Sequence, residues 1–159
     1  MKIIAIDPGT KESAYVSWNG RVILDMDILD NDIILELIKS YKYLKGFTLV
    51  IEQVRCYGMV VGASTLDTVF WSGRFCEAWK GGDGSWSLMP RMDVKMHLCH
   101  DSRAKDKNIR QALIDRFEPH LKPRQRPKNV LKGVGTHLWA AMALAVTWWD
   151  LNNKKEGEI

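Results

Sequence analysis

The chain opens with Met1-Lys-Ile-Ile-Ala-Ile-Asp-Pro-Gly-Thr10, and this stretch decides the fold. Five of its first six residues are apolar, which predicts a buried strand over residues 2–6. The run ends on a carboxylate, Asp7, after which Pro8 and Gly9 favour a turn. A second apolar strand, predicted over residues 47–54, also carries an acid near its end, Glu52. A buried carboxylate is costly unless something compensates its charge, so both acids are candidate functional residues.

The remaining elements follow from periodicity and turn signals. Residues 13–18 and 21–28 predict two strands joined by Asn19-Gly20, a strong hairpin signal. A short strand is predicted over residues 85–89, and residues 118–133 form a basic, Pro-containing loop. Helices are predicted over residues 30–41, 64–80, 94–98, 106–117 and 136–151. Strands mixed with helices in this order predict an α/β fold, with a mixed five-stranded sheet flanked by helices.

Length and composition predict one globular domain over residues 1–159, because the chain is 46% hydrophobic and 26% charged. Its three cysteines fit no zinc pattern and favour free thiols in a reducing cytosol, so we expect a cytoplasmic protein. The start of the chain lacks a secretory pattern. The longest uncharged apolar segment, residues 133–149, falls short of the roughly 20 residues that span a bilayer, so we expect no membrane association.

Charge is unevenly distributed along the chain. Residues 91–132 hold 12 Lys and Arg against 5 Asp and Glu, a net charge of +7, whereas the remainder carries −3. This pattern suits either a polyanion-binding surface beside an acidic site or a solvated basic face without a partner.

The two strand-end acids indicate a metal site if their strands are neighbours. Two close carboxylates repel each other, which raises at least one pKa unless a cation lies between them. Mg²⁺ or Mn²⁺ would relieve this repulsion, since hard cations take carboxylate oxygens. Two such ions, about 3.5–4 Å apart, activate water and stabilise a phosphate leaving group. The alternative is that each acid caps a turn or pairs with a lysine.

The last predicted helix contains one histidine, His137, among apolar residues. Positions 137, 140 and 144 share a face of that helix. A lone histidine in such a helix is more often a satisfied core residue than a ligand. A functional role therefore requires that this face meets Asp7 and Glu52.

Three motifs together resemble the RuvC family of Holliday junction resolvases, in particular its phage-type branch. They are Asp7-Pro-Gly-Thr10, Ile51-Glu-Gln-Val54 and Ala141-Met-Ala-Leu-Ala-Val-Thr147. If the protein is phage-encoded, as that branch implies, the expected location is the cytoplasm of the bacterial host. The resemblance spans essentially the whole chain and implies a ribonuclease H-like fold. It also implies a homodimeric, structure-selective endonuclease that hydrolyses phosphodiesters in four-way DNA junctions, and in three-way or fork DNA, with two Mg²⁺ or Mn²⁺ ions per site.

The same resemblance assigns roles to the candidate acids and the histidine. Asp7 would bridge both ions, Glu52 would hold one, and His137 would ligate the second ion or orient the attacking water. The family has an aspartate where this chain has Ala140. We interpret Ala140 as the replacement of a native aspartate that inactivates the site by removing metal binding. A natural inactive paralogue, a non-catalytic protein that binds branched DNA, is the alternative.

Asp150 cannot replace that aspartate, because it lies roughly 15 Å further along the helix at 1.5 Å per residue.

The basic stretch predicts phosphate contacts that position DNA without reading its sequence. Lys105 or Lys107 could also stabilise charge at the scissile phosphate. The candidate DNA-binding residues are Arg55, Arg103, Lys105, Lys107, Arg110, Lys122, Arg124, Arg126, Lys128 and Lys132.

Two aromatic features leave alternatives open. The family often carries an aromatic wedge after its second motif, and here Arg55 or Tyr57 would take that place. The predicted helix over residues 64–80 carries an aromatic stripe that is either a dimer face or part of the core. The stripe consists of Phe70, Trp71, Phe75 and Trp79.

Overall fold

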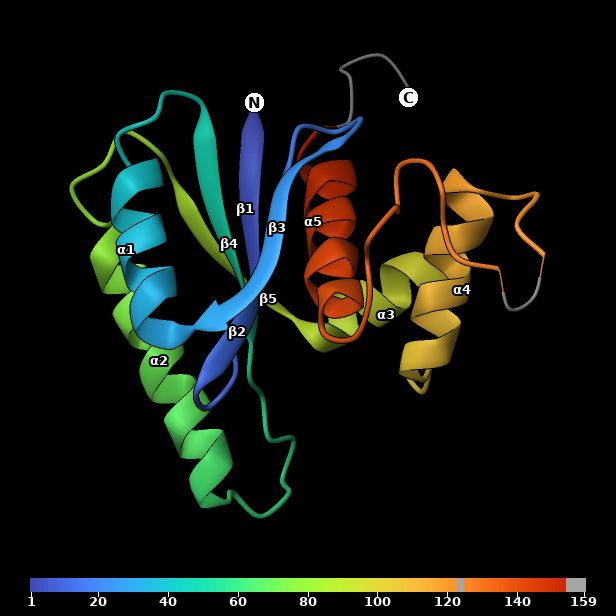
Figure 1. Cartoon of the computed structure of the whole chain (residues 1–159). Helices are drawn as coiled ribbons and strands as arrows, with labels where there is room; N and C mark the ends of the chain where they lie inside the picture. The colour runs from blue at the N-terminus through green and yellow to red at the C-terminus, as the bar shows by residue number, and fades with distance from the viewer. Residues whose placement is uncertain (123–124, 154–159) are drawn as a thin grey trace.

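The computed structural model describes residues 1–122 and 125–153, and its centre is a mixed five-stranded sheet (Figure 1). The strands are β1 (Lys2–Asp7), β2 (Glu12–Trp18), β3 (Ile23–Asp30), β4 (Phe47–Gln53) and β5 (Trp86–Pro90). Their order across the sheet is β3-β2-β1-β4-β5. The first three strands form an antiparallel meander, and β4 and β5 then continue parallel to β1. The prediction of a mixed five-stranded sheet is confirmed.

Helices cover both faces of this sheet (Figure 1). They are α1 (Asn31–Tyr41), α2 (Ala63–Trp79), α3 (Arg91–Cys99), α4 (Asp106–Phe117) and α5 (Leu138–Asn152). α1 and α2 lie on one face, α5 lies on the other, and α3 and α4 pack beyond α5. The predicted helix over residues 94–98 begins earlier than expected, at Arg91. The reason is that Pro90 does not separate β5 from the helix but serves as its N-cap, where its missing N–H costs nothing.

Side chains of β1 and β4 alternate between two buried cores. Ile3, Ala5 and Val50 pack in the core that contains α5, whereas Ile4 and Ile51 pack in the core that contains α1 and α2. Both faces of these strands are therefore buried, which explains why they read as continuous apolar runs. α5 is buried from Ala141 to Trp148, as predicted for the last apolar segment. In the described part of the chain no helix combines the length and apolarity needed to cross a membrane.

A hairpin forms at Asn19-Gly20 as predicted, but its loop covers residues 19–22, so β3 begins at Ile23 rather than at residue 21 and ends at Asp30 rather than at residue 28. The Asn19 side-chain oxygen accepts hydrogen bonds from the backbone N–H groups of Arg21 and Val22, each at 2.9 Å. Gly20 has a φ of 89°, and a Cβ there would collide with the Trp149 ring of α5. Only glycine satisfies both conditions, so this turn fixes the β2–β3 hairpin against the end of α5.

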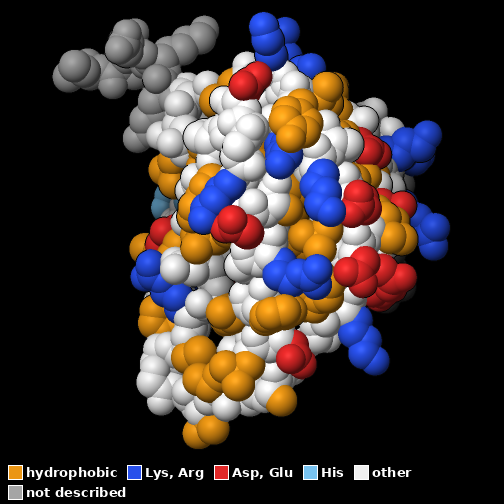
Figure 2. All heavy atoms as spheres, turned by 90° about the vertical axis from the view of Figure 1, so that its left-hand side faces the viewer, with side chains coloured by type: hydrophobic (Ala, Val, Ile, Leu, Met, Phe, Trp, Pro, Cys, Tyr) orange, Lys and Arg blue, Asp and Glu red, His pale blue; other side chains and the backbone are white. Residues whose placement is uncertain are grey.

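The aromatic stripe of α2 divides between the core and the surface. Phe75 and Trp79 are fully buried, as the core interpretation predicts, but Phe70 is 62% exposed. Leu66 and Val69 of the same helix are also exposed, and we call these three residues the α2 apolar patch. Figure 2 views the α1–α2 face and shows hydrophobic side chains gathered at its lower end.

Candidate active site

The register between β1 and β4 brings the two strand-end acids together. The strands are parallel and Ile6 lies beside Ile51. Asp7 follows Ile6 and Glu52 follows Ile51, so the two acids lie next to each other on neighbouring strands. By alternation both acids lie on the face of Ala5 and Val50, which is the face covered by α5. The sequence-based expectation that these acids meet at one end of the sheet is confirmed.

A buried hydrogen-bond network shapes the turn that follows Asp7. A Cβ at Gly9 would collide with the carbonyl of Glu12, so the tight turn requires glycine. The Gly9 N–H donates to Ser13 Oγ at 3.1 Å, and Ser13 Oγ donates to Asn31 Oδ1 at 2.6 Å. Asn31 Nδ2 closes the network by donating to the Gly9 carbonyl at 3.0 Å. The first residue of α1 thereby holds the end of β1, and Asp7 with it, in place.

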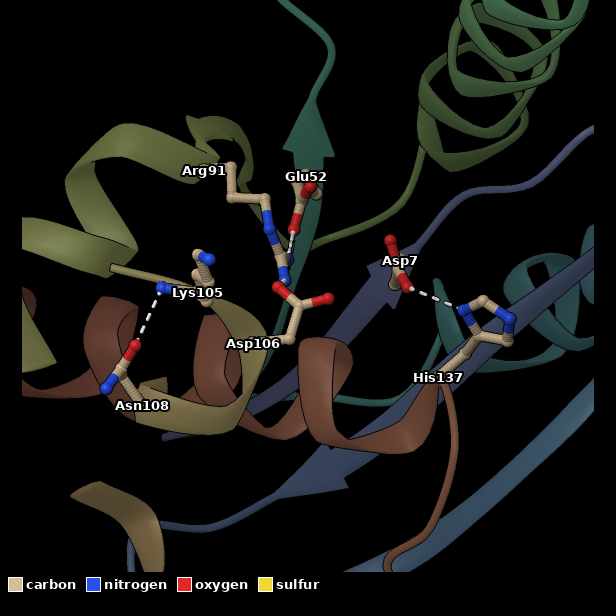
Figure 3. Close-up of polar contacts among 7 residues, drawn as sticks. All are labelled: Asp7, Glu52, Arg91, Lys105, Asp106, Asn108 and His137. Atoms are coloured by element: carbon tan, nitrogen blue, oxygen red, sulfur yellow. Dashed lines mark hydrogen bonds and ion pairs between the residues drawn. The ribbon is translucent and has the colours of Figure 1, made fainter. Parts of the chain in front are cut away.

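His137 lies beside Asp7 at the start of α5. Its Nδ1 is 3.9 Å from Asp7 Oδ2, and its side chain is 79% exposed, so it is not a satisfied core histidine (Figure 3). α5 begins at Leu138 rather than at Thr136, because Thr136 adopts a positive φ of 38° that a helix cannot contain. His137 is consequently the N-cap of α5, next to the carboxyl end of β1.

The side chains of Asp7, Glu52 and His137 line one cavity of about 220 Å³. Ala140, one turn into α5, lines the same cavity and contributes only a methyl group. The lining residues are Asp7, Glu52, Arg91, Asp106, Ile109, Thr136, His137, Trp139 and Ala140. Asp150 lies away from this cavity, as predicted, and accepts hydrogen bonds from Arg116 Nη2 at 2.8 Å and from His97 Nε2 at 2.7 Å.

Two charged residues of the cavity were not predicted from the sequence, Arg91 and Asp106. Arg91 Nη1 donates to Glu52 Oε2 at 2.8 Å, and Nη2 donates to Asp106 Oδ1 at 2.6 Å (Figure 3). Arg91 directly follows β5, the parallel neighbour of β4. Its position beside Glu52 could therefore be inferred once the order of the strands was known. The expected alternative partner for these acids was a lysine, and Glu52 is paired with an arginine instead.

Asp106 reaches the cavity through the packing of helices rather than through the sheet. It is the first residue of α4, so the helix dipole favours its negative charge at this point. The turn before it is held by Asn108, whose Oδ1 accepts the Lys105 N–H at 2.9 Å (Figure 3). In sequence Asp106 is one acid within a basic stretch, and nothing there marks it as part of the site.

The electrostatics of the cavity are those of crowded carboxylates. Burial, and then the neighbouring charge of Glu52, raise the pKa of Asp7 to about 7; Arg91 opposes this shift and Asp106 adds to it. Burial also raises the pKa of Glu52, against the charge and hydrogen bond of Arg91. Three acids thus share the cavity with one arginine, which leaves an excess of negative charge.

The chemistry of this donor set fits a hard divalent cation. Carboxylate oxygens are the ligands that Mg²⁺ and Mn²⁺ prefer, and imidazole is compatible with Mn²⁺. An added cation would offset the repulsion that raises the Asp7 pKa. Among residues 1–122 and 125–153, no three His, Cys, Asp or Glu side chains converge closely enough to hold a metal as they lie. The side chains of His137 and Asp106 are 79% and 84% exposed, and a bound cation would have to draw them toward Asp7 and Glu52.

The predicted DNA-binding residues are exposed wherever the structure describes them. Arg103, Lys105 and Lys107 lie at the start of α4, next to the cavity that Asp106 lines. Arg110 stacks 5.1 Å from the ring of Trp139, another cavity residue. Lys122, Arg126, Lys128 and Lys132 lie along the loop before α5, whereas Arg124 lies outside the described residues.

The two candidates for a junction wedge lie after β4. Arg55 Nε donates to Gln53 Oε1 at 2.9 Å, and Tyr57 is 61% exposed with a positive φ of 43°. Both side chains are accessible, and neither lines the cavity of Asp7 and Glu52. The choice between them stays a prediction.

Comparison with solved structures identifies the architecture. The structure of Thermus thermophilus RuvC matches with a TM-score of 0.70 at 15% sequence identity, over 95% of this chain and 96% of that chain. The fold is that of RuvC. T. thermophilus RuvC in complex with a Holliday junction substrate also matches, with a TM-score of 0.67 at 16% identity over 92% of both chains. By sequence, no protein-family model and no curated protein matches the chain. The RuvC-like fold confirms the predicted ribonuclease H-like α/β architecture.

Proposed function

We propose that this protein is a structure-selective endonuclease that cuts branched DNA, with the four-way junction as its principal substrate. The observation that carries the proposal is the meeting of Asp7, Glu52 and His137 in one cavity of a RuvC-like fold. The resemblance in the sequence motifs points to the same reaction, and a RuvC of the same fold has been solved with a Holliday junction. Assignment to the phage-type branch stays a prediction.

The proposed chemistry is hydrolysis of a phosphodiester. Asp7, Glu52 and His137 would hold Mg²⁺ or Mn²⁺, two ions per site, which supply an activated water and stabilise the leaving oxygen. Arg91 keeps Glu52 oriented through its 2.8 Å hydrogen bond and favours the ionised carboxylate. The exposed imidazole of His137 can orient the attacking water or accept its proton at a ring nitrogen.

DNA would approach across the basic surface around α4. Lys105 and Lys107 flank Asp106 in sequence, so a backbone phosphate that they contact is delivered to the edge of the cavity. Such contacts bind the duplex through its phosphates, which makes affinity fall with salt.

In this proposal the protein acts as a homodimer, so that its two active sites can cut a junction symmetrically. Support comes from the α2 apolar patch, because exposed apolar side chains grouped on one face mark interaction surfaces (Figure 2). Phe70→Asp should convert a dimer to a monomer in light scattering, whereas the exposed Ile33→Asp on α1 should not. A wild-type chain that is monomeric at all concentrations tested would exclude this assembly.

Position 140 separates three accounts of this site. If Ala140 replaces a native catalytic aspartate, only Ala140→Asp will cleave. If the missing acid is supplied by another residue, the chain itself will cleave. If the protein is a non-catalytic module, which the methyl group at position 140 also permits, neither will cleave but both will bind junctions.

A gel assay with Mg²⁺ on four-way, three-way and linear duplex DNA tests the proposal. We expect cleavage of the branched substrates and not of the linear duplex, by the chain itself or by Ala140→Asp. Asp7→Asn should abolish it in either background. Junction binding without cleavage by both proteins would favour the non-catalytic module, and equal cleavage of all three substrates would contradict structural selectivity.

A further inference from the structure

Asp106 supplies a carboxylate to the cavity of Asp7 and Glu52, to which position 140 contributes none. The cavity is bounded by Asp7 and Glu52 on the sheet, by Ala140 on α5 and by Asp106 on α4. The methyl group of Ala140 offers no donor atom. Asp106 supplies a carboxylate to the same cavity from a different helix, so the site keeps three acids although position 140 has none.

The contacts of Asp106 connect it to a proposed metal ligand, Glu52, through Arg91. One guanidinium, Arg91, is bonded to Glu52 at 2.8 Å and to Asp106 at 2.6 Å through adjacent nitrogens. Figure 3 shows the Asp106 carboxylate between Arg91 and the side of the cavity where Asp7 lies. Through Arg91 the exposed Asp106 carboxylate is thus linked to Glu52, which is only 15% exposed.

The position of Asp106 also suits a group that must move onto a cation. It is the first residue of α4, where the unsatisfied N–H groups of the helix favour a carboxylate. Its side chain is 84% exposed, and to turn toward Asp7 it would have to release its 2.6 Å ion pair with Arg91. Arg91 then retains Glu52 as a partner when Asp106 turns away.

We propose that Asp106 is the third acidic metal ligand of this site and takes the place of the aspartate absent at position 140. The third carboxylate of the site would then come from the start of α4 instead of from α5, and both helices line the same cavity. This inference rests on the proposed function, and it makes the chain a competent enzyme rather than an inactivated one.

Metal binding tests the inference independently of cleavage. Titration of the protein with Mn²⁺, followed by calorimetry and by the Mn²⁺-dependent rise in Tm, should show binding by the wild-type chain. Asp106→Asn should weaken Mn²⁺ binding at least tenfold. Asp115→Asn, a matched exposed aspartate at the other end of α4, should bind as the wild type does.

A second-site variant makes the test sharper. Ala140→Asp placed in the Asp106→Asn background should recover Mn²⁺ affinity, because it returns an acid to the same cavity from α5. Equal Mn²⁺ affinity in Asp106→Asn and wild type would overturn the inference and leave the proposed function standing. The inference would also be overturned if the Ala140→Asp variant bound Mn²⁺ and the wild-type chain did not. No Mn²⁺ binding by any variant would overturn the proposed metal-dependent function itself.

Discussion

Ile6 of β1 lies directly beside Ile51 of the parallel strand β4, and this pairing creates the site. It places Asp7 beside Glu52 at the carboxyl ends of two strands that are buried on both faces. A slip of one residue in either strand would send its acid to the α1–α2 core instead, since the side-chain period of a strand is two. The register of these two strands therefore determines whether the acids share a cavity at all.

Stability of the metal-free protein should depend on pH through Asp7. Its pKa is raised from 3.8 to about 7, so the fold favours the protonated carboxyl. This stabilisation is complete below about pH 4 and is lost as the pH rises through about 7. In EDTA, Asp7→Asn should therefore be more stable than wild type at pH 8, by up to about 4 kcal/mol, and the difference should shrink toward pH 4. Urea unfolding at both pH values measures it, and a pH-independent difference would contradict the burial of an ionisable Asp7.

The Arg91–Glu52 pair should show strong thermodynamic coupling. Its side chains are only 28% and 15% exposed, so removing Arg91 leaves a carboxylate without its partner in a poorly hydrated place. A double-mutant cycle of Arg91→Met and Glu52→Gln should give a coupling energy of about 1–3 kcal/mol. The exposed Lys39–Glu36 pair of α1 provides the control, with an expected coupling below about 0.5 kcal/mol. Similar coupling in both pairs would mean that Glu52 is solvated in solution.

Two glycine-to-alanine substitutions should have opposite effects. Gly9→Ala places a methyl group against the Glu12 carbonyl and disrupts the turn that holds Asp7, so it should lower both stability and cleavage. Gly73→Ala, on the exposed side of α2, has no heavy atom within 4 Å of the added methyl group. It should stabilise the protein by about 0.5–1 kcal/mol and leave cleavage unchanged. Thermal unfolding and the junction assay measure the two effects, and a neutral Gly9→Ala would refute the role of this turn.

DNA affinity should depend on salt through the basic residues near α4. Replacing Lys105 and Lys107 together by Gln should weaken junction binding and reduce the slope of log K against log salt by about 0.9 for each phosphate that is no longer neutralised. Lys45→Gln, at the opposite end of the sheet before β4, should change neither quantity. Fluorescence anisotropy at several salt concentrations provides the measurement. An unchanged slope in the double variant would exclude the surface around α4 from the DNA interface.

Most of the sheet and one half of the site were predictable from local sequence. Continuous apolar runs predict β1 and β4, because strands that are covered on both faces need no polar alternation. Asp7 and Glu52 stand out because a carboxylate in such a run is costly to bury. Gly9 and Gly20 mark turns because a side chain at either position would collide with a neighbour. The neighbour is the Glu12 carbonyl at Gly9 and the Trp149 ring at Gly20.

Arg91 and Asp106 could not be identified in this way, because each has a role only through partners distant in sequence. Arg91 is 39 residues from Glu52 in the chain, and Asp106 joins the site only because α4 packs beside α5. The local sequence pattern predicts which residues are buried and where the chain forms turns. The tertiary structure alone decides which charges meet, because an electrostatic contact depends on the distance between atoms and not on their separation along the chain.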